Sequence, residues 1–200
     1  MTQKKYKLCR RLGTPIFEKC QTAKFAQSEP VKKGKKMGGR RSDYGNQLIE
    51  KQKVRFMYGV REKQFGNYVE HAMETAKKGT TPATLLFRQL EERLDNVIYR
   101  LGFASTRALA RQMASHGHFT VNGKKMTIPS YAVKLGDVVA IREGSKSNGL
   151  FAEAAVKLKA VKKPEWLTWD DKALTAKVSG DPKTPDAFLN FQAVIEFYSR

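Results

Sequence analysis

Hydrophobic residues recur every three or four positions along four stretches of this chain, the spacing that places them on one face of an α-helix. These stretches predict helices over 43–58, 61–78, 82–101 and 106–116. The third prediction is for one continuous helix, because a single apolar stripe runs through it as far as a closing glycine. The fourth helix follows Ser105, a residue type that caps helix N-termini.

The hydrophobic period falls to two after position 117, which indicates β-strands. Asn122-Gly123 separates the first two of them and favours a tight hairpin, because both of its turn residues need positive φ. Strands are expected over 119–121, 124–128 and 138–141, a linker over 144–149, a short helix over 151–161, and strand-like pieces over 166–169, 174–178 and 194–198. Together these elements predict an α+β fold.

Charge narrows the class of partner. The 200-residue chain carries 38 Lys and Arg against 19 Asp and Glu, a formal net charge of +19 at pH 7, and most of the excess lies in the first 90 residues. Such a charge predicts a polyanionic partner, with nucleic acid first and an acidic membrane surface second. No apolar run of about 18 residues occurs, so no membrane-spanning helix is expected, and no secretory signal is expected either.

The densest basic stretch runs from Lys32 to Arg41 and contains three glycines. Because lysine and glycine cannot build a buried core, we expect this stretch to be extended in isolation and to become ordered by neutralising phosphates. The alternative interpretation is a solvated flexible tail.

Catalytic and metal-binding motifs are not marked in this sequence. Gly34 and Gly39 have the spacing of a phosphate-binding loop, but Arg40-Arg41 follows them instead of Lys-Ser/Thr. Cys9 and Cys20 are eleven positions apart without a second pair, so we expect two thiols packed as small hydrophobic groups and no zinc. The sequence therefore predicts no enzyme activity, no metal and no cofactor. Two cysteines also make no disulfide scaffold, and a reducing intracellular compartment fits best.

One segment resembles a known RNA-binding module. Residues 94–108 read Leu-Asp-Asn-Val-Ile-Tyr-Arg-Leu-Gly-Phe-Ala-Ser-Thr-Arg-Ala, which is similar to the opening of the module first named for ribosomal protein S-four. The similarity continues through Ser115-His116-Gly117, Val121-Asn122-Gly123 and Gly136-Asp137-Val138-Val139. The module also occurs in tyrosyl-tRNA synthetases, pseudouridine synthases and a heat-shock protein.

The flanking residues resemble the ribosomal protein family itself. Arg40-Arg41-Ser42-Asp43-Tyr44-Gly45 precedes the module, and Ile195-Glu196-Phe197-Tyr198-Ser199-Arg200 closes the chain. The resemblance to the bacterial S-four family of small-subunit ribosomal proteins extends from about residue 6 to the last residue. Some members carry four N-terminal cysteines that bind zinc, and two of those are absent here.

The resemblance implies an architecture. A basic, mainly helical N-terminal domain would occupy 1–91, and the RNA-binding module, with helices packed on a short antiparallel β-sheet, would occupy 92–155. The segment 156–200 would return to pack on the N-terminal domain.

The resemblance also implies partners. Members of the family are structural constituents of the small ribosomal subunit in the cytoplasm, bind the 5′ domain of its RNA directly and nucleate assembly. They contact the neighbouring ribosomal protein S-five, lie near the place where messenger RNA enters the subunit and, with other proteins, influence translational accuracy.

Candidate RNA contacts come from basic and aromatic residues. Arg107 and Arg111 are four positions apart on the helix over 106–116, so they share one face, which we expect to be an exposed basic surface for RNA phosphates. The N-terminus of that helix favours an anion as well. The full set of candidates is Arg10, Arg11, Lys35, Lys36, Arg40, Arg41, Tyr44, Lys51, Lys53, Arg55, Tyr58, Arg61, Lys63, Arg100, Ser105, Thr106, Arg107, Arg111, His116, Asn122, Lys124 and Lys125.

Two other functions use the same module. An RNA-modifying enzyme such as a pseudouridine synthase would need a catalytic domain with a positioned aspartate, and too few residues follow position 149 to form one. A free-standing RNA chaperone of the heat-shock type would lack the helical N-terminal domain and the Tyr-Ser-Arg end seen here.

Overall fold

The computed structural model describes residues 5–27, 42–76, 79–151, 163–170, 173–183 and 185–200, together with 158 and 161. The chain divides into two compact units, which we call the helical unit, 1–86 with 185–200, and the mixed unit, 87–184. The predicted extended stretch from Lys32 to Arg41 and most of the predicted helix over 151–161 lie outside the described residues.

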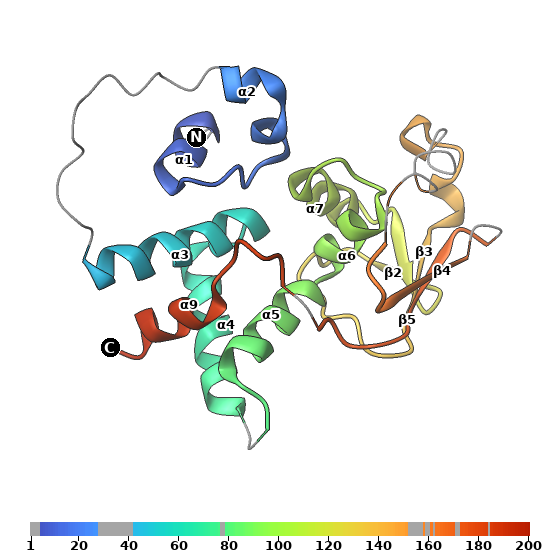
Figure 1. Ribbon diagram of the computed structural model, residues 1–200. Helices are drawn as coiled ribbons and strands as arrows, with labels where there is room; N and C mark the ends of the chain where they lie inside the picture. Colours follow the sequence, from blue (N-terminus) through green and yellow to red (C-terminus); the bar gives the residue numbers. More distant parts are fainter. Residues whose placement is uncertain are drawn as a thin grey trace. The chain divides into compact units, whose positions relative to one another are not determined.

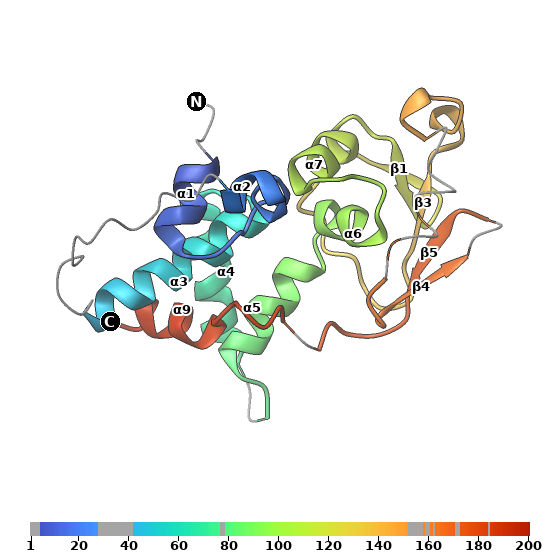
Figure 2. The same cartoon turned by 45° about the horizontal axis from the view of Figure 1, so that its top comes forward.

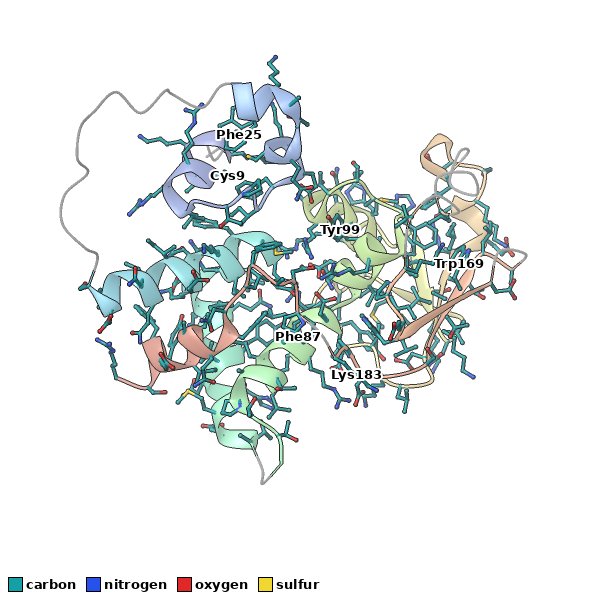
Figure 3. All side chains as sticks on the ribbon, viewed as in Figure 1. Cys9, Phe25, Phe87, Tyr99, Trp169 and Lys183 are labelled. Carbon is teal, nitrogen blue, oxygen red and sulfur yellow. The ribbon has the colours of Figure 1, made fainter. Side chains whose placement is uncertain are left out.

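The N-terminal part of the helical unit is a cluster of short helices. It contains α1 (Lys5–Leu12), the 3₁₀ turn η1 (Glu18–Gln21) and α2 (Ala23–Gln27). Their buried side chains are Cys9, Leu12, Ile16, Cys20 and Phe25, against which Ile49 and Phe56 also pack. Figure 3 shows Cys9 and Phe25 lying together among these helices.

The longest described helix is α3 (Asp43–Tyr58), and its ends follow from two residues. The Ser42 hydroxyl accepts a hydrogen bond from the Gly45 amide at 3.2 Å and caps the N-terminus. Gly59 ends the helix at φ +63°, a left-handed conformation that glycine adopts without steric cost. The prediction of a helix over 43–58 is therefore confirmed, and α4 (Glu62–Thr75) confirms the next one.

The C-terminal helix α9 (Phe191–Tyr198) packs on α3 and also contacts α4 (Figure 1). Asn190 caps it by accepting a hydrogen bond from the Ala193 amide at 3.0 Å. The predicted strand over 194–198 is wrong. Its β-branched and aromatic residues suggested a strand, but Phe191, Val194 and Ile195 lie at helical spacing and bury one helix face.

The predicted single helix over 82–101 is also wrong, because it divides into α5 (Pro82–Glu91) and α6 (Leu94–Leu101). Arg93, between them, has extended backbone and forms an isolated β-bridge with Ala132. The Leu94 amide donates to the Tyr131 carbonyl at 2.8 Å. Hydrogen bonds to this distant loop replace those of a continuous helix. The spacing of apolar residues in the sequence does not reveal these hydrogen bonds.

The mixed unit contains a five-stranded antiparallel sheet in the order β2-β1-β3-β5-β4. Its strands are β1 (Phe119–Val121), β2 (Lys124–Met126), β3 (Val138–Ile141), β4 (Leu167–Asp170) and β5 (Thr175–Val178). The predicted hairpin is confirmed, with φ +51° at Asn122 and +78° at Gly123. The α+β fold class is confirmed with it.

The mixed unit extends beyond residue 155, where the module was predicted to end. β4 and β5 belong to the mixed unit, because β5 pairs with β3 and β4 pairs with β5. Of the predicted C-terminal segment 156–200, only 185–200 joins the helical unit. Strand pairing across a long loop is set by the whole sheet, so the local sequence gives no signal of which sheet a short strand joins.

α6 and α7 (Arg107–Ser115) pack together and against the sheet, as both views show (Figures 1 and 2). The core between them includes Leu94, Ile98, Met113, Phe119 and Val139. Trp166 is buried there, and Trp169 packs at its margin, as expected of core residues. Within the described ranges, no helix has the length and apolar character needed to cross a membrane.

Candidate nucleic-acid interface

The first turn of α6 places a buried carboxylate among arginines. Asp95 accepts two hydrogen bonds from Arg93, from Nε to Oδ1 at 3.0 Å and from an Nη to Oδ2 at 2.8 Å. It also accepts one from Arg111 Nε of α7 at 2.8 Å. The Asp95 side chain is 4% exposed and that of Arg111 is 35% exposed. One buried acid therefore fixes an arginine that reaches solvent.

A second buried carboxylate repeats this arrangement at the end of α5. Glu91 accepts from Arg100 Nε at 3.0 Å and from an Nη at 2.8 Å, a two-point contact with fixed geometry. The Asn96 amide donates to Glu91 at 3.0 Å, while its oxygen accepts from Arg107 Nε at 2.8 Å. Glu91 and Asn96 thus hold Arg100 and Arg107 in one connected network.

Arg107 contradicts one expectation about the basic face. It is buried, and its guanidinium lies over the Tyr99 ring, 4.3 Å from the centroid. Figure 3 shows Tyr99 on the side of α6 that faces α7. The expectation that Arg107 and Arg111 form an exposed pair is therefore wrong for Arg107, because the face of α7 that carries it packs on α6.

The N-terminus of α7 is capped one residue later than expected. Thr106, not Ser105, is the N-cap, and its hydroxyl accepts from the Leu109 amide at 3.1 Å. Ser105 is exposed. Both residues remain candidate RNA contacts on position alone, since they stand where helix amides favour an anion.

The hairpin carries its lysines on the edge strand of the sheet. Lys124 and Lys125 are both exposed on β2. Gly117, at φ +72°, is buried beneath the Lys125 side chain, so a methyl group there would collide with it. His116 is exposed at the end of α7. These positions agree with a basic, accessible edge.

Asn122 has a local structural task. Its amide donates to an Asp137 carboxylate oxygen at 2.8 Å, and its own oxygen accepts from the Val138 amide at 2.9 Å. The side chain therefore joins the hairpin turn to the start of β3. A contact with RNA would have to share a side chain already committed to the turn.

In the helical unit, the structure separates the predicted candidates into two groups. Tyr58 is 2% exposed, so this candidate RNA contact lies in the core and not at the surface. Lys51 is buried, pairs with Glu62 and lies over the rings of Phe197 and Tyr198. The Lys51 side chain therefore lies between α3, α4 and α9, and Tyr58 is buried as well, which helical spacing alone does not reveal.

The remaining candidates of the helical unit reach the surface to different extents. Lys53 pairs with Glu50 at 2.7 Å, and Arg55 contacts Glu62 at 3.1 Å. Exposed candidates are Arg10, Arg11, Tyr44, Arg61 and Lys63. Lys35, Lys36, Arg40 and Arg41 lie outside the described residues.

Burial shifts the pKa values of several groups. It raises the pKa of the Cys20 thiol, which is hydrogen-bonded with Cys9, to about 12. Burial, followed by the nearby Glu62 carboxylate, raises the pKa of Tyr198 to about 12. Burial lowers the pKa of His118, and the neighbouring His116 adds to the effect. In the part of the chain that the structure describes, no three potential ligands among His, Cys, Asp and Glu cluster around a metal position.

The candidate interface also includes residues that the sequence did not predict. Glu91, Asp95 and Asn96 hold arginines of α6 and α7 in place, although acidic and amide side chains are not expected as parts of a basic surface. The signal was present in the sequence, because Asp95-Asn96 lies within the motif similar to the RNA-binding module. Lys177, exposed on β5, was missed as well, because its strand was assigned to another domain.

Comparison with known proteins finds matches to two protein-family models, which cover successive parts of the chain. A family model for the ribosomal protein S4/S9 N-terminal domain matches residues 1–91, and one for the S4 domain, the S-four module above, matches residues 92–139. The chain is 49% identical to the small ribosomal subunit protein uS4 of Verminephrobacter eiseniae, over 98% of this chain and 97% of that relative.

The proteins of the same name from Variovorax paradoxus and Herminiimonas arsenicoxydans are 49% and 44% identical, with the same coverage of both chains. The similarity therefore spans both units and the C-terminal helix. This chain belongs to the family of the small ribosomal subunit protein uS4.

Proposed function

We propose that the chain is a non-catalytic constituent of the small ribosomal subunit that binds the 5′ domain of small-subunit ribosomal RNA and nucleates subunit assembly. The observation that carries the proposal is the set of arginines held by buried carboxylates in the S4 domain. Arg100 and Arg111 are partly exposed, with 24% and 35% of their side chains accessible, and each pairs with a buried carboxylate. A rigid guanidinium suits the planar, two-point recognition of phosphate.

The formal charge of +19 supports the same proposal, because each neutralised phosphate releases counterions and adds to affinity. The exposed lysines of β2 extend the basic surface to the sheet edge. Folded RNA hides its base edges in a narrow major groove, so we expect recognition of shape, phosphates and 2′-hydroxyls. The protein would then act in the cytoplasm as part of the subunit, without a metal or an organic cofactor.

The family resemblance adds finer proposals. We infer contacts with ribosomal protein S-five and with messenger RNA where it enters the subunit, and an influence on translational accuracy. These proposals rest on similarity to the family and not on the geometry of any one side chain.

The test is the affinity for two transcripts of equal length from the same ribosomal RNA, one from the 5′ domain and one from the 3′ domain. We expect the 5′-domain transcript to bind about a hundredfold or more tightly at equal salt. Equal affinities would contradict the proposal and leave only non-specific attraction.

A single-residue comparison tests the exposed sheet edge. Lys124→Ala should weaken binding and lower the slope of log affinity against log salt by about 0.7–0.9. Lys146→Ala is the matched control, because this lysine of the same unit pairs locally with Glu143 at 2.7 Å. An unchanged slope for Lys124→Ala would move the contact away from the hairpin.

A further inference from the structure

Asp95 is an acidic residue inside a module that we propose to bind a polyanion. Its side chain is buried, and burial of a charge is unfavourable unless it is paired. Arg93 is sufficient to compensate this charge, because it contacts both carboxylate oxygens at 2.8 and 3.0 Å and is itself buried. The second guanidinium, that of Arg111, is therefore not needed to neutralise Asp95.

Arg111 differs from Arg93 in exposure. Its Nε lies 2.8 Å from Asp95 Oδ2, yet about a third of its side chain is accessible to solvent. Because Arg93 already pairs with Asp95, the partly exposed Arg111 adds less stability than a first partner would, and ordering its long side chain costs entropy. Stability alone therefore gives a weak reason for this pairing, whereas an arginine that must meet a ligand gains from being ordered beforehand.

We propose that Asp95 is a positioning residue that holds Arg111 in the orientation in which it binds an RNA phosphate. This inference rests on the proposed function. Asp95 stands in the first turn of α6, and its amide donates to the Pro129 carbonyl at 3.0 Å, so its backbone is fixed from two sides. Arg111 comes from α7, so the contact also sets how the guanidinium stands relative to the helix pair.

The proposal and simple electrostatics predict opposite changes in RNA affinity when Asp95 is replaced. Replacing Asp95 with Asn removes a negative charge from a basic protein, so charge alone predicts tighter RNA binding. Loss of positioning predicts weaker binding, because Arg111 would then have to be ordered at the moment of association.

The experiment is a double-mutant cycle with Asp95→Asn and Arg111→Ala, measured as affinity for the 5′-domain transcript across a range of salt. We expect each single change to weaken binding about tenfold, the size of one hydrogen bond to a charged group. Arg111→Ala should lower the salt slope by about 0.7–0.9. In the Arg111→Ala background, Asp95→Asn should cause no further loss of binding.

Three results would overturn the proposal: unchanged or tighter binding by Asp95→Asn, additive losses in the double variant, or unchanged binding by Arg111→Ala. Glu143→Gln is the control, because it removes an exposed carboxylate of the same unit, and its binding should not weaken. If Asp95→Asn does not fold, shown by a lost thermal transition, Arg111→Lys decides. This variant keeps the charge but not the planar group, so we expect weaker binding, and equal binding would refute positioning. Absence of specific binding by the unmodified protein would instead refute the proposed function.

Discussion

Lys51 provides a sharp test of the fold, because this basic side chain is buried between helices. Its ammonium pairs with Glu62 and lies 4.7 Å from the centroid of the Phe197 ring and 5.4 Å from that of Tyr198. The side chain is 9% exposed. The interaction therefore links α3 to the C-terminal helix α9, and Lys51→Met should loosen that helix while keeping most of the apolar stem.

The magnitude follows from these contacts. A desolvated cation–π contact contributes about 2 kcal/mol, and an ion pair with a half-exposed acid adds at most about 1 kcal/mol. Glu62 keeps a second partner in Arg55, at 3.1 Å, so it is not left as an isolated charge. We expect Lys51→Met to lower the local unfolding free energy of α9 by about 2 kcal/mol, which corresponds to roughly 30-fold faster amide exchange.

Hydrogen exchange followed by mass spectrometry measures this effect in peptides that cover Phe191–Tyr198. Lys63→Met is the matched control, because Lys63 is an exposed lysine on α4, and its effect should stay within about 0.5 kcal/mol. Unchanged exchange of α9 in Lys51→Met would refute the reasoning. A salt slope of RNA binding reduced by about 0.7–0.9 in the folded variant would instead restore Lys51 as a phosphate contact.

Three further predictions concern the cap of α7, a histidine and the buried thiols. Thr106→Ala should destabilise the protein by about 1 kcal/mol in thermal unfolding and Ser105→Ala should not, because only Thr106 caps the helix. NMR titration should find the pKa of His118 below the ordinary 6.5. Because this pKa is lower in the folded than in the unfolded state, the free energy of unfolding should rise with pH between the folded pKa and about 6.5. Cys9 and Cys20 should resist a thiol reagent at pH 8 and react at once in guanidinium chloride, because both are buried and the pKa of Cys20 is about 12.

The sequence predicted elements whose ends are set locally. Ser42 and Gly59 bound α3, and Asn122-Gly123 forms the hairpin turn, because caps and turns depend on a few neighbouring residues. It failed at Arg93, where a bridge to Ala132 interrupts an unbroken apolar stripe. Long-range pairing of this kind leaves no periodic signal.

The sequence predicted which residue types form the candidate interface better than it predicted which of their side chains are exposed. Exposed Lys124 and Lys125 lie where the hairpin placed them, whereas Tyr58, Lys51 and Arg107 are buried. Helical spacing identifies residues that share a face but not whether that face meets solvent or another helix. A lysine or arginine can lie on a solvent-exposed face or on a packed face of a helix, since its long apolar stem packs well against other side chains.

Sedimentation tests the central claim most directly. This claim is that the protein is a stable component of the small subunit and does not bind RNA only through non-specific charge attraction. Small and large subunits from cells producing a tagged form of the protein would be separated on gradients at low and high salt. We predict that the protein stays with the small subunit in equimolar amount at high salt, because the proposed phosphate contacts would be supported by side chains of fixed geometry. Release from the small subunit at high salt, or equal binding to both subunits, would contradict the account.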